Sequence, residues 1–187
     1  MRVGTGGRKS RPARIVVAVV VVQAALLGGY WVVEHRRSQE TVAGQELSTA
    51  APQRVEGRVQ PLLLRTREGE PVELRTLERR TLVHFWATWC PACRVELPGL
   101  LALAQKRPLD VVAIALDKEW ADVDRFLNGH HSTHVLLGDH AEVERAFDVH
   151  TLPVTFLVEP GGRLRLRFDG ARDWTDSAFL GTWIDGE

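Results

Sequence analysis

The sequence predicts an α/β domain built on a mixed β-sheet that is flanked by helices. Two observations lead to this prediction. From residue 81 onward, apolar segments of strand length alternate with segments of helical period, a pattern typical of strands joined by helices. The last two apolar segments are separated only by Pro160-Gly161-Gly162, a turn sequence that adds a hairpin at the end of the domain.

The individual elements are expected in the following order. An N-terminal β-hairpin comprises residues 61–64 and 72–74, with its turn at 67–70. Further strands are expected at 81–86, 111–116, 135–137, 155–158 and 164–168, and helices at 91–106, 120–127, 141–147 and 175–184. The segment 111–116 is continuously apolar, as in a strand buried on both faces, and Pro98 is expected to kink the first helix.

A membrane anchor is expected before this domain. Residues 1–14 carry five basic side chains and no acidic one, and residues 15–33 contain no charge. In a helix, these nineteen residues span about 28 Å, close to the hydrocarbon thickness of a bilayer. Only two arginines follow directly, so the positive-inside rule places residues 1–14 in the cytoplasm and the rest outside.

A cleaved signal peptide is the alternative for this segment, and a buried core helix is another. A cleavable apolar region is usually about 7–15 residues long and precedes small residues. Here the apolar run is longer and is followed by Glu34-His35-Arg36-Arg37. We therefore expect residues 15–33 to be retained as a single-pass signal-anchor in the inner membrane, with a polar tether at 34–60 and a periplasmic domain at 61–187.

The charge distribution argues against a nucleic-acid partner. The chain has 24 Lys and Arg and 24 Asp and Glu, but residues 1–37 hold seven of the basic residues and one acid. Residues 38–187 therefore carry seventeen basic and twenty-three acidic residues, a net charge of −6. A domain that binds nucleic acid generally presents a basic face instead.

The two cysteines, Cys90 and Cys93, are the centre of the predicted chemistry. They lie at the junction of a predicted strand and helix, where unpaired N–H groups and the helix dipole stabilise a thiolate. Cys90 would lie at the helix end and Cys93 one turn further in, more buried. Pro91 can begin the helix without losing a hydrogen bond. A redox pair is favoured; half of a zinc site or a structural disulfide stays an alternative, although a second ligand pair is missing.

The run from His84 to Pro98, HFWATWCPACRVELP, resembles the active-site segment of membrane-anchored thioredoxins of the TlpA/ResA/CcmG (DsbE) type. The resemblance extends from about residue 61 to the C-terminus. It includes residues 109–148, which resemble the central insertion that separates this family from plain thioredoxin. It implies a thioredoxin-like fold, no cofactor, and an extracytoplasmic reductase of selected protein disulfides.

The resemblance also implies the partners. Frequent substrates in that family are the haem-binding cysteines of apocytochrome c, in cytochrome c-type biogenesis, and the cysteines of copper-site proteins. Electrons arrive from a membrane thiol donor of the DsbD/CcdA type. A DsbA-like disulfide oxidase and a copper-binding assembly module are the alternatives. A peroxidase is disfavoured because a Pro-x-x-x-Thr-x-x-Cys run is absent from the sequence.

By the same resemblance, Pro153 is the cis-proline that lies against the cysteines, and the backbone of Leu152 pairs with an extended substrate segment. Trp89 and Pro91 support the active site. An ordinary trans proline that opens a strand is the alternative for Pro153.

Two further side chains are candidates for proton transfer. Glu96 follows Cys93 by three residues, and the resemblance makes it a proton acceptor or pKa tuner; a solvated acid in the first helical turn is the alternative. His84 replaces the Asp or Asn of relatives. It would tune the cysteine pKa as a cation or be an ordinary hydrogen-bonded core histidine. Five other histidines match no metal-ligand spacing and are expected on the surface, so no metal site is predicted: His130, His131, His134, His140 and His150.

Overall fold

The computed structural model describes residues 23, 47–74, 77–130 and 132–185. The segments expected at 1–14 and 15–33 lie outside the described residues, apart from Gln23, as does the tether as far as residue 46. Within the described part of the chain, no helix is long and apolar enough to cross a membrane. Residues Gln45–Glu187 form one compact unit, and the fold is that of this unit.

The unit contains one sheet of eight strands in the order β1-β8-β7-β4-β5-β6-β2-β3. The strands are β1 (Gln53–Arg54), β2 (Leu63–Arg65), β3 (Pro71–Glu73), β4 (Thr81–Trp86), β5 (Asp110–Ala115), β6 (Val135–Leu137), β7 (Val154–Glu159) and β8 (Arg163–Asp169). β4, β5 and β6 are parallel, and every other pairing is antiparallel. The predicted mixed sheet, including the β2–β3 and β7–β8 hairpins, is confirmed.

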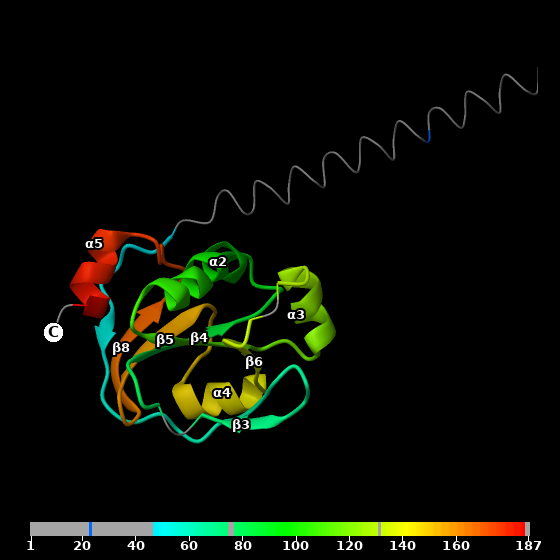
Figure 1. Ribbon diagram of the computed structural model, residues 1–187, viewed down its shortest axis with the longest axis horizontal. Helices are drawn as coiled ribbons and strands as arrows, with labels where there is room; N and C mark the ends of the chain where they lie inside the picture. Colours follow the sequence, from blue (N-terminus) through cyan, green and yellow to red (C-terminus); the bar gives the residue numbers. More distant parts are fainter. Residues whose placement is uncertain (1–22, 24–46, 75–76, 131, 186–187) are drawn as a thin grey trace, which may run out of the picture. The chain divides into compact units, whose positions relative to one another are not determined.

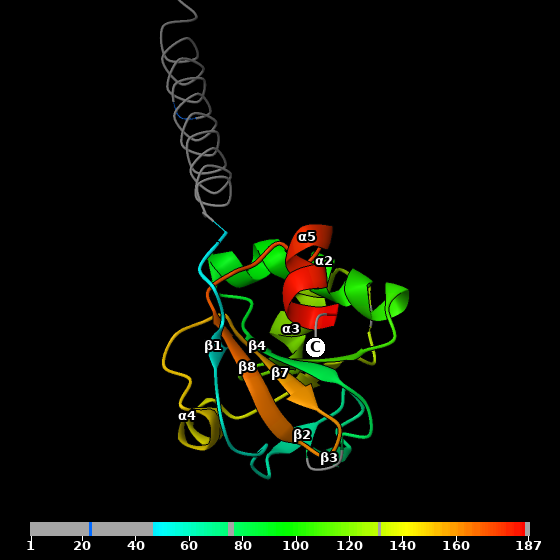
Figure 2. The same ribbon diagram turned by 90° about the vertical axis from the view of Figure 1, so that its left-hand side faces the viewer.

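Helices cover both faces of the sheet (Figures 1 and 2). They are α2 (Pro91–Lys106), α3 (Trp120–Leu127), α4 (His140–Phe147) and α5 (Ser177–Leu180), which continues as the π-helical turn η1 (Gly181–Asp185). α4 packs Val143 and Phe147 against Phe85 on one face. α2, α3 and the C-terminal helical segment pack on the other face.

Alternation along the central strand β4 divides its side chains between these two layers. Val83 and Phe85 face α4, whereas Leu82 and Trp86 belong to the clusters formed with α2. His84 lies between Leu82 and Trp86 in this alternation, so it faces α2. A histidine in this position is buried beneath the helix that begins at the cysteines.

Two details differ from the predicted elements. The segment 47–60, expected to belong to the tether, contributes the edge strand β1, which pairs with Leu166 and Arg167 of β8. A two-residue exposed strand has no apolar alternation, which is why the sequence pattern does not reveal it. The helix expected at 175–184 begins only at Ser177, because the Asp176 side chain accepts hydrogen bonds from the first backbone N–H groups as an N-cap. The helix predicted at 91–106 is confirmed as α2, with Pro98 inside it.

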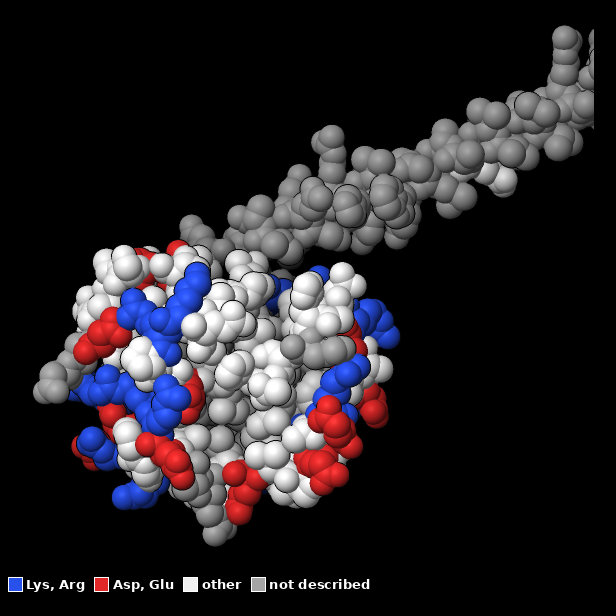
Figure 3. Space-filling model, in the orientation of Figure 1, with Lys and Arg blue, Asp and Glu red and all other residues white. Residues whose placement is uncertain are grey.

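Charged side chains of both signs are distributed over the domain surface. On the face shown in Figure 3, basic and acidic side chains lie beside one another, with uncharged surface between them. Among the described residues on this face there is no continuous basic surface of the kind that nucleic-acid binding requires.

Candidate active site

Cys90 and Cys93 form a disulfide at the N-terminus of α2, with their Cα atoms 5.3 Å apart. Cys90 is the N-cap residue, and its Sγ accepts a hydrogen bond of 3.2 Å from the Cys93 backbone N–H. Pro91 is the first helical residue, as expected. Because the helix begins at Pro91, the backbone N–H groups of its first turn point towards the sulfur of Cys90.

The two sulfurs differ in accessibility. The Cys93 residue is fully buried and Cys90 is 6% exposed, whereas the neighbouring Trp89 is 60% exposed. The Trp89 ring stacks on His140, the first residue of α4, with the ring centroids 6.4 Å apart. An incoming molecule therefore reaches Cys90 beside an aromatic surface and does not reach Cys93.

The loop between β4 and α2 is held by Asp117, which sequence analysis did not identify. The Thr88 backbone N–H and hydroxyl donate to the two carboxylate oxygens of Asp117, at 3.0 and 2.6 Å. Asp117 is 6% exposed and directly follows the strand pattern that ends at Leu116. The position of Asp117 directly after a buried strand could have revealed this role. Because β4 and β5 are parallel, they end at the same edge of the sheet, where Asp117 meets the loop after β4.

The Leu152–Pro153 peptide bond is cis, as the resemblance implies. Pro153 directly precedes β7, whose first residue Val154 pairs with Phe85 near the end of β4. Leu152 packs against the apolar cluster that includes Cys90 and Cys93. The structure thus brings the segment predicted to hold substrate next to the cysteine pair.

Glu96 is buried on the face of α2 that also carries Cys93, and only 3% of the residue is exposed. Its Oε2 accepts hydrogen bonds from the Arg172 backbone N–H at 2.7 Å and from Trp174 Nε1 at 3.0 Å. Burial disfavours the carboxylate more than these donors favour it and raises the pKa of Glu96 to about 8. The alternative of a solvated acid in the first helical turn is wrong.

His84 is completely buried between β7 and α2. Its Nδ1 lies 2.9 Å from Thr155 Oγ1, and its Nε2 lies 3.5 Å from Glu96 Oε1. Burial lowers the pKa of His84 to about 3. The imidazole is therefore neutral at physiological pH, and the expectation of a cationic His84 is not supported. Burial thus favours the neutral form of both His84 and Glu96 near neutral pH.

Arg172 and Trp174 complete the surroundings of Glu96, and sequence analysis missed both. They follow β8, 76 and 78 residues from Glu96 in the chain. The Arg172 guanidinium donates to the carbonyl oxygens of Ser48, Ala50 and Asp169, so it also fixes the segment that leads into β1. Local sequence gives no signal for such a long-range contact.

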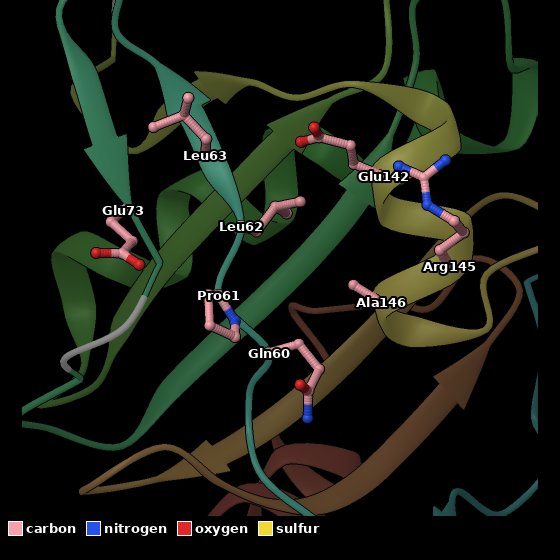
Figure 4. A pocket seen from close by; sticks show the side chains of 8 residues that line it. All are labelled: Gln60, Pro61, Leu62, Leu63, Glu73, Glu142, Arg145 and Ala146. Atoms are coloured by element: carbon pink, nitrogen blue, oxygen red, sulfur yellow. The ribbon is translucent and has the colours of Figure 1, made fainter.

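Two cavities of the domain differ in their position relative to the cysteine pair. One of about 770 Å³ lies between α4 and the β2–β3 hairpin and is lined by Leu62, Leu63 and Glu142 among others, with neither cysteine in its wall (Figure 4). A second, of about 640 Å³, adjoins Trp89 and His140. Of these two cavities, only the second is lined by a residue next to Cys90, namely Trp89. In the described part of the chain, no three His, Cys, Asp or Glu side chains are grouped to hold a metal ion.

Comparisons with known proteins agree with this geometry. The AhpC/TSA family profile matches residues 55–167. The sporulation thiol-disulfide oxidoreductase A of Bacillus subtilis is 24% identical over 127 residues, which cover 61% of this chain and 77% of the relative. Thiol-disulfide oxidoreductase ResA of Oceanobacillus iheyensis is 30% identical over 105 residues, 54% of this chain and 55% of ResA. The chain thus spans about half the length of that second relative.

The fold is shared with a solved structure described as a thiol:disulfide interchange protein DsbE from Chlorobium tepidum. The two chains are 23% identical and superpose with a TM-score of 0.59, covering 73% of this chain and 99% of the other. At this level of identity the comparison establishes the thioredoxin-like fold and nothing finer.

The raised pKa of Glu96 predicts a pH dependence of stability. A carboxyl with a higher pKa in the folded state binds more protons folded than unfolded, so the free energy of unfolding falls as pH rises towards the folded pKa. The opposite contribution of His84, whose folded pKa is lowered, increases stability up to about its ordinary pKa of 6.5 and levels off above it. Between about pH 6.5 and pH 8.5, the oxidised protein should lose about 1–2 kcal/mol through Glu96.

Urea unfolding of the oxidised wild type and of Glu96→Gln, measured across this pH interval, checks the prediction. Titrations shared by both proteins, such as that of His150, cancel in the comparison. Equal slopes in the two proteins would show that Glu96 is already ionised below the interval.

Proposed function

The chain belongs to the AhpC/TSA family and is a thiol-disulfide oxidoreductase of the ResA and DsbE type, and we propose that it reduces selected protein disulfides outside the cytoplasm. The observation that carries the proposal is the disulfide at the N-terminus of α2, with one sulfur at the surface and the other enclosed. This asymmetry assigns different roles to the two cysteines.

In the proposed reaction, the Cys90 thiolate attacks one sulfur of a substrate disulfide. This sulfur becomes bonded to Cys90 in a mixed disulfide, the substrate S–S bond breaks, and the other substrate sulfur leaves as a thiolate. Cys93 then loses its proton and attacks Cys90 Sγ, which breaks the mixed disulfide, releases the substrate sulfur that was bonded to Cys90 and closes the Cys90–Cys93 bond. Two electrons pass from the protein dithiol to the substrate, and the N–H groups of the first helical turn stabilise the Cys90 thiolate.

Glu96 is proposed to handle the proton of Cys93. The two residues are three positions apart on the buried face of α2, and such residues are neighbours on a helix surface. A group that transfers protons works best when its pKa lies near the ambient pH, and burial places Glu96 in this range. Because Cys93 is closed to bulk solvent, the proposed acceptor of its proton is the ionised form of Glu96, which is in equilibrium with the protonated form near neutral pH.

The substrate is proposed to bind as an extended polypeptide beside Cys90. The backbone of Leu152 offers hydrogen-bonding groups next to the cysteine pair, as in β-augmentation. The exposed Trp89 and the cavity of about 640 Å³ beside it provide room and apolar surface for the residues that flank the substrate cysteines. Apocytochrome c or a copper-site protein remains the proposed substrate class, and a DsbD/CcdA-type thiol carrier the proposed donor.

The proposed location rests on the sequence alone. Residues 15–33 would anchor the chain in the inner membrane, with the domain in the periplasm and the basic residues 1–14 in the cytoplasm. A periplasmic position suits the reaction, because disulfides that need reduction form in oxidising compartments.

Substrate trapping tests the roles of the two cysteines. Without Cys93 the mixed disulfide cannot be resolved, so full-length Cys93→Ala should accumulate covalent adducts in cells, all bound through Cys90. The adducts are detected on non-reducing gels and identified by mass spectrometry, with Cys90→Ala as the matched control. Adducts with Cys90→Ala but not with Cys93→Ala would reverse the assignment. Recovery of the adducts in the soluble cytoplasmic fraction would contradict the proposed location.

A redox titration against glutathione tests the direction of electron flow. A reductase should have a potential well below that of the glutathione buffer in oxidising compartments, below roughly −200 mV. The ratio of oxidised to reduced protein is measured by alkylation and mass shift. A potential near about −120 mV, as in DsbA, would identify a disulfide oxidase instead.

A further inference from the structure

His84 stands in a chain of three buried side chains from three elements. His84 belongs to β4, Thr155 to β7, which pairs with it directly, and Glu96 to the helix above. The imidazole contacts Thr155 Oγ1 through Nδ1 at 2.9 Å and approaches Glu96 Oε1 through Nε2 at 3.5 Å. Each ring nitrogen of His84 thus faces one defined oxygen.

The hydrogen bonds around Glu96 determine which of its two carboxyl oxygens carries the proton in the neutral form. Glu96 Oε2 already accepts from the Arg172 backbone N–H and from Trp174 Nε1. Within the described part of the chain, Glu96 Oε1 and His84 Nε2 are both buried without a hydrogen-bond partner. A proton on Oε1 would point at Nε2, and one shared hydrogen would satisfy both atoms.

We infer that His84 is a positioning residue that changes its tautomer whenever Glu96 gains or loses a proton. When Glu96 is protonated, its Oε1–H donates to Nε2, and the Nδ1–H of the ring donates to the Thr155 hydroxyl oxygen. When Glu96 is ionised, the ring carries its proton on Nε2, which donates to the carboxylate, and Nδ1 accepts from the Thr155 hydroxyl. The imidazole is neutral in both states.

The two states differ by a single proton, the one that Glu96 releases. The hydroxyl of Thr155 serves as acceptor in the first state and as donor in the second, which a threonine can do by rotating its O–H. In either state, both ring nitrogens of His84 and both carboxyl oxygens of Glu96 have a hydrogen-bond partner. A phenylalanine or leucine in place of His84 could not offer this, because it supplies neither a donor nor an acceptor.

The charged and titratable groups around His84 are few. From α2 it faces Glu96; Cys93, on the same buried face of that helix, is bonded in the disulfide and does not titrate in the oxidised protein. From β7 it faces Thr155, and in β5 its neighbour is Ala113. The Arg172 guanidinium acts on Glu96 through its charge and favours the ionised form. Protonation of His84 itself is opposed by its burial.

The tautomer change does not depend on the proposed function, but its role in the reaction rests on it. In a dithiol exchange, Glu96 must exist in both protonation states within one catalytic cycle. A histidine that can accept from the neutral acid and donate to the carboxylate keeps both states accessible in a site closed to bulk solvent. The tautomer change itself can be observed without any substrate, so its failure and the failure of the proposed function are distinguishable.

Nitrogen NMR of the oxidised full chain, labelled with 15N-histidine and kept in detergent, is the direct test. The two ring nitrogens of a neutral histidine have distinct shifts that identify the protonated one. His84 should carry its proton on Nδ1 below about pH 6.5 and on Nε2 above about pH 9.5, on either side of the Glu96 transition. The signals are assigned by their loss in His84→Asn.

Two controls accompany the titration. His134 directs its Nδ1 at the Val111 carbonyl oxygen, 3.1 Å away, which can only accept, so its neutral form should keep Nδ1–H throughout. In Glu96→Gln the His84 tautomer should not change with pH. A single His84 tautomer over the whole range in the wild type, or an imidazolium that forms near neutral pH, would overturn the inference.

Kinetics of the reduced protein give a second readout. His84→Leu removes the partner of Glu96 Oε1 in both states. The hydrogen bond to the carboxylate is the stronger of the two because it is charge-assisted, so the pH midpoint of disulfide reduction should rise by about one unit or more. His84→Asn, whose amide can donate or accept, should retain a midpoint close to that of the wild type. Equal midpoints in wild type and His84→Leu would contradict the positioning role, and the tautomer measurement in the wild type remains decisive if His84→Leu does not fold.

Discussion

The burial of one carboxyl group beneath α2 is the constraint on which the rest of the site depends. Glu96 lies where an ionised side chain would be costly, and two distant parts of the chain supply its partners. The loop after β8 provides the Arg172 backbone N–H and the Trp174 indole, and β4 provides His84. The result is an acid that remains protonated near neutral pH and is positioned by contacts rather than by solvent.

The same helix places the cysteines in two environments. Its first residues lie at the edge of the sheet where β4 and β5 end, and the Thr88–Asp117 hydrogen bonds fix the loop that carries Cys90 there. One turn further in, Cys93 and Glu96 turn towards the core. An accessible cysteine, a covered cysteine and a buried carboxyl group therefore all follow from the position of one helix above one strand. Arg172 connects this arrangement to the segment before β1.

Much of this fold could be predicted from the sequence, because strands and helices are indicated by patterns among neighbouring residues. The apolar period gives the strands from Thr81 to Phe168, and the cysteine spacing with Pro91 gives the start of α2. The partners of Glu96 could not be found in this way, because Arg172 and Trp174 lie more than 70 residues away and their contacts arise from packing. The state of His84 could not be predicted either. Its neutrality follows from complete burial, and burial of a polar residue is invisible in a pattern that counts apolar positions.

The central claim is that the buried Glu96 carboxyl remains protonated near neutral pH. Infrared difference spectroscopy of the oxidised full chain, titrated from about pH 6 to about pH 10, detects the carbonyl stretch of a protonated carboxylic acid directly. The account predicts that one such band disappears with a midpoint near 8, that it shifts in deuterated water, and that it is absent from Glu96→Gln. Loss of every protonated-carboxyl band below pH 6, with no later change, would contradict the account.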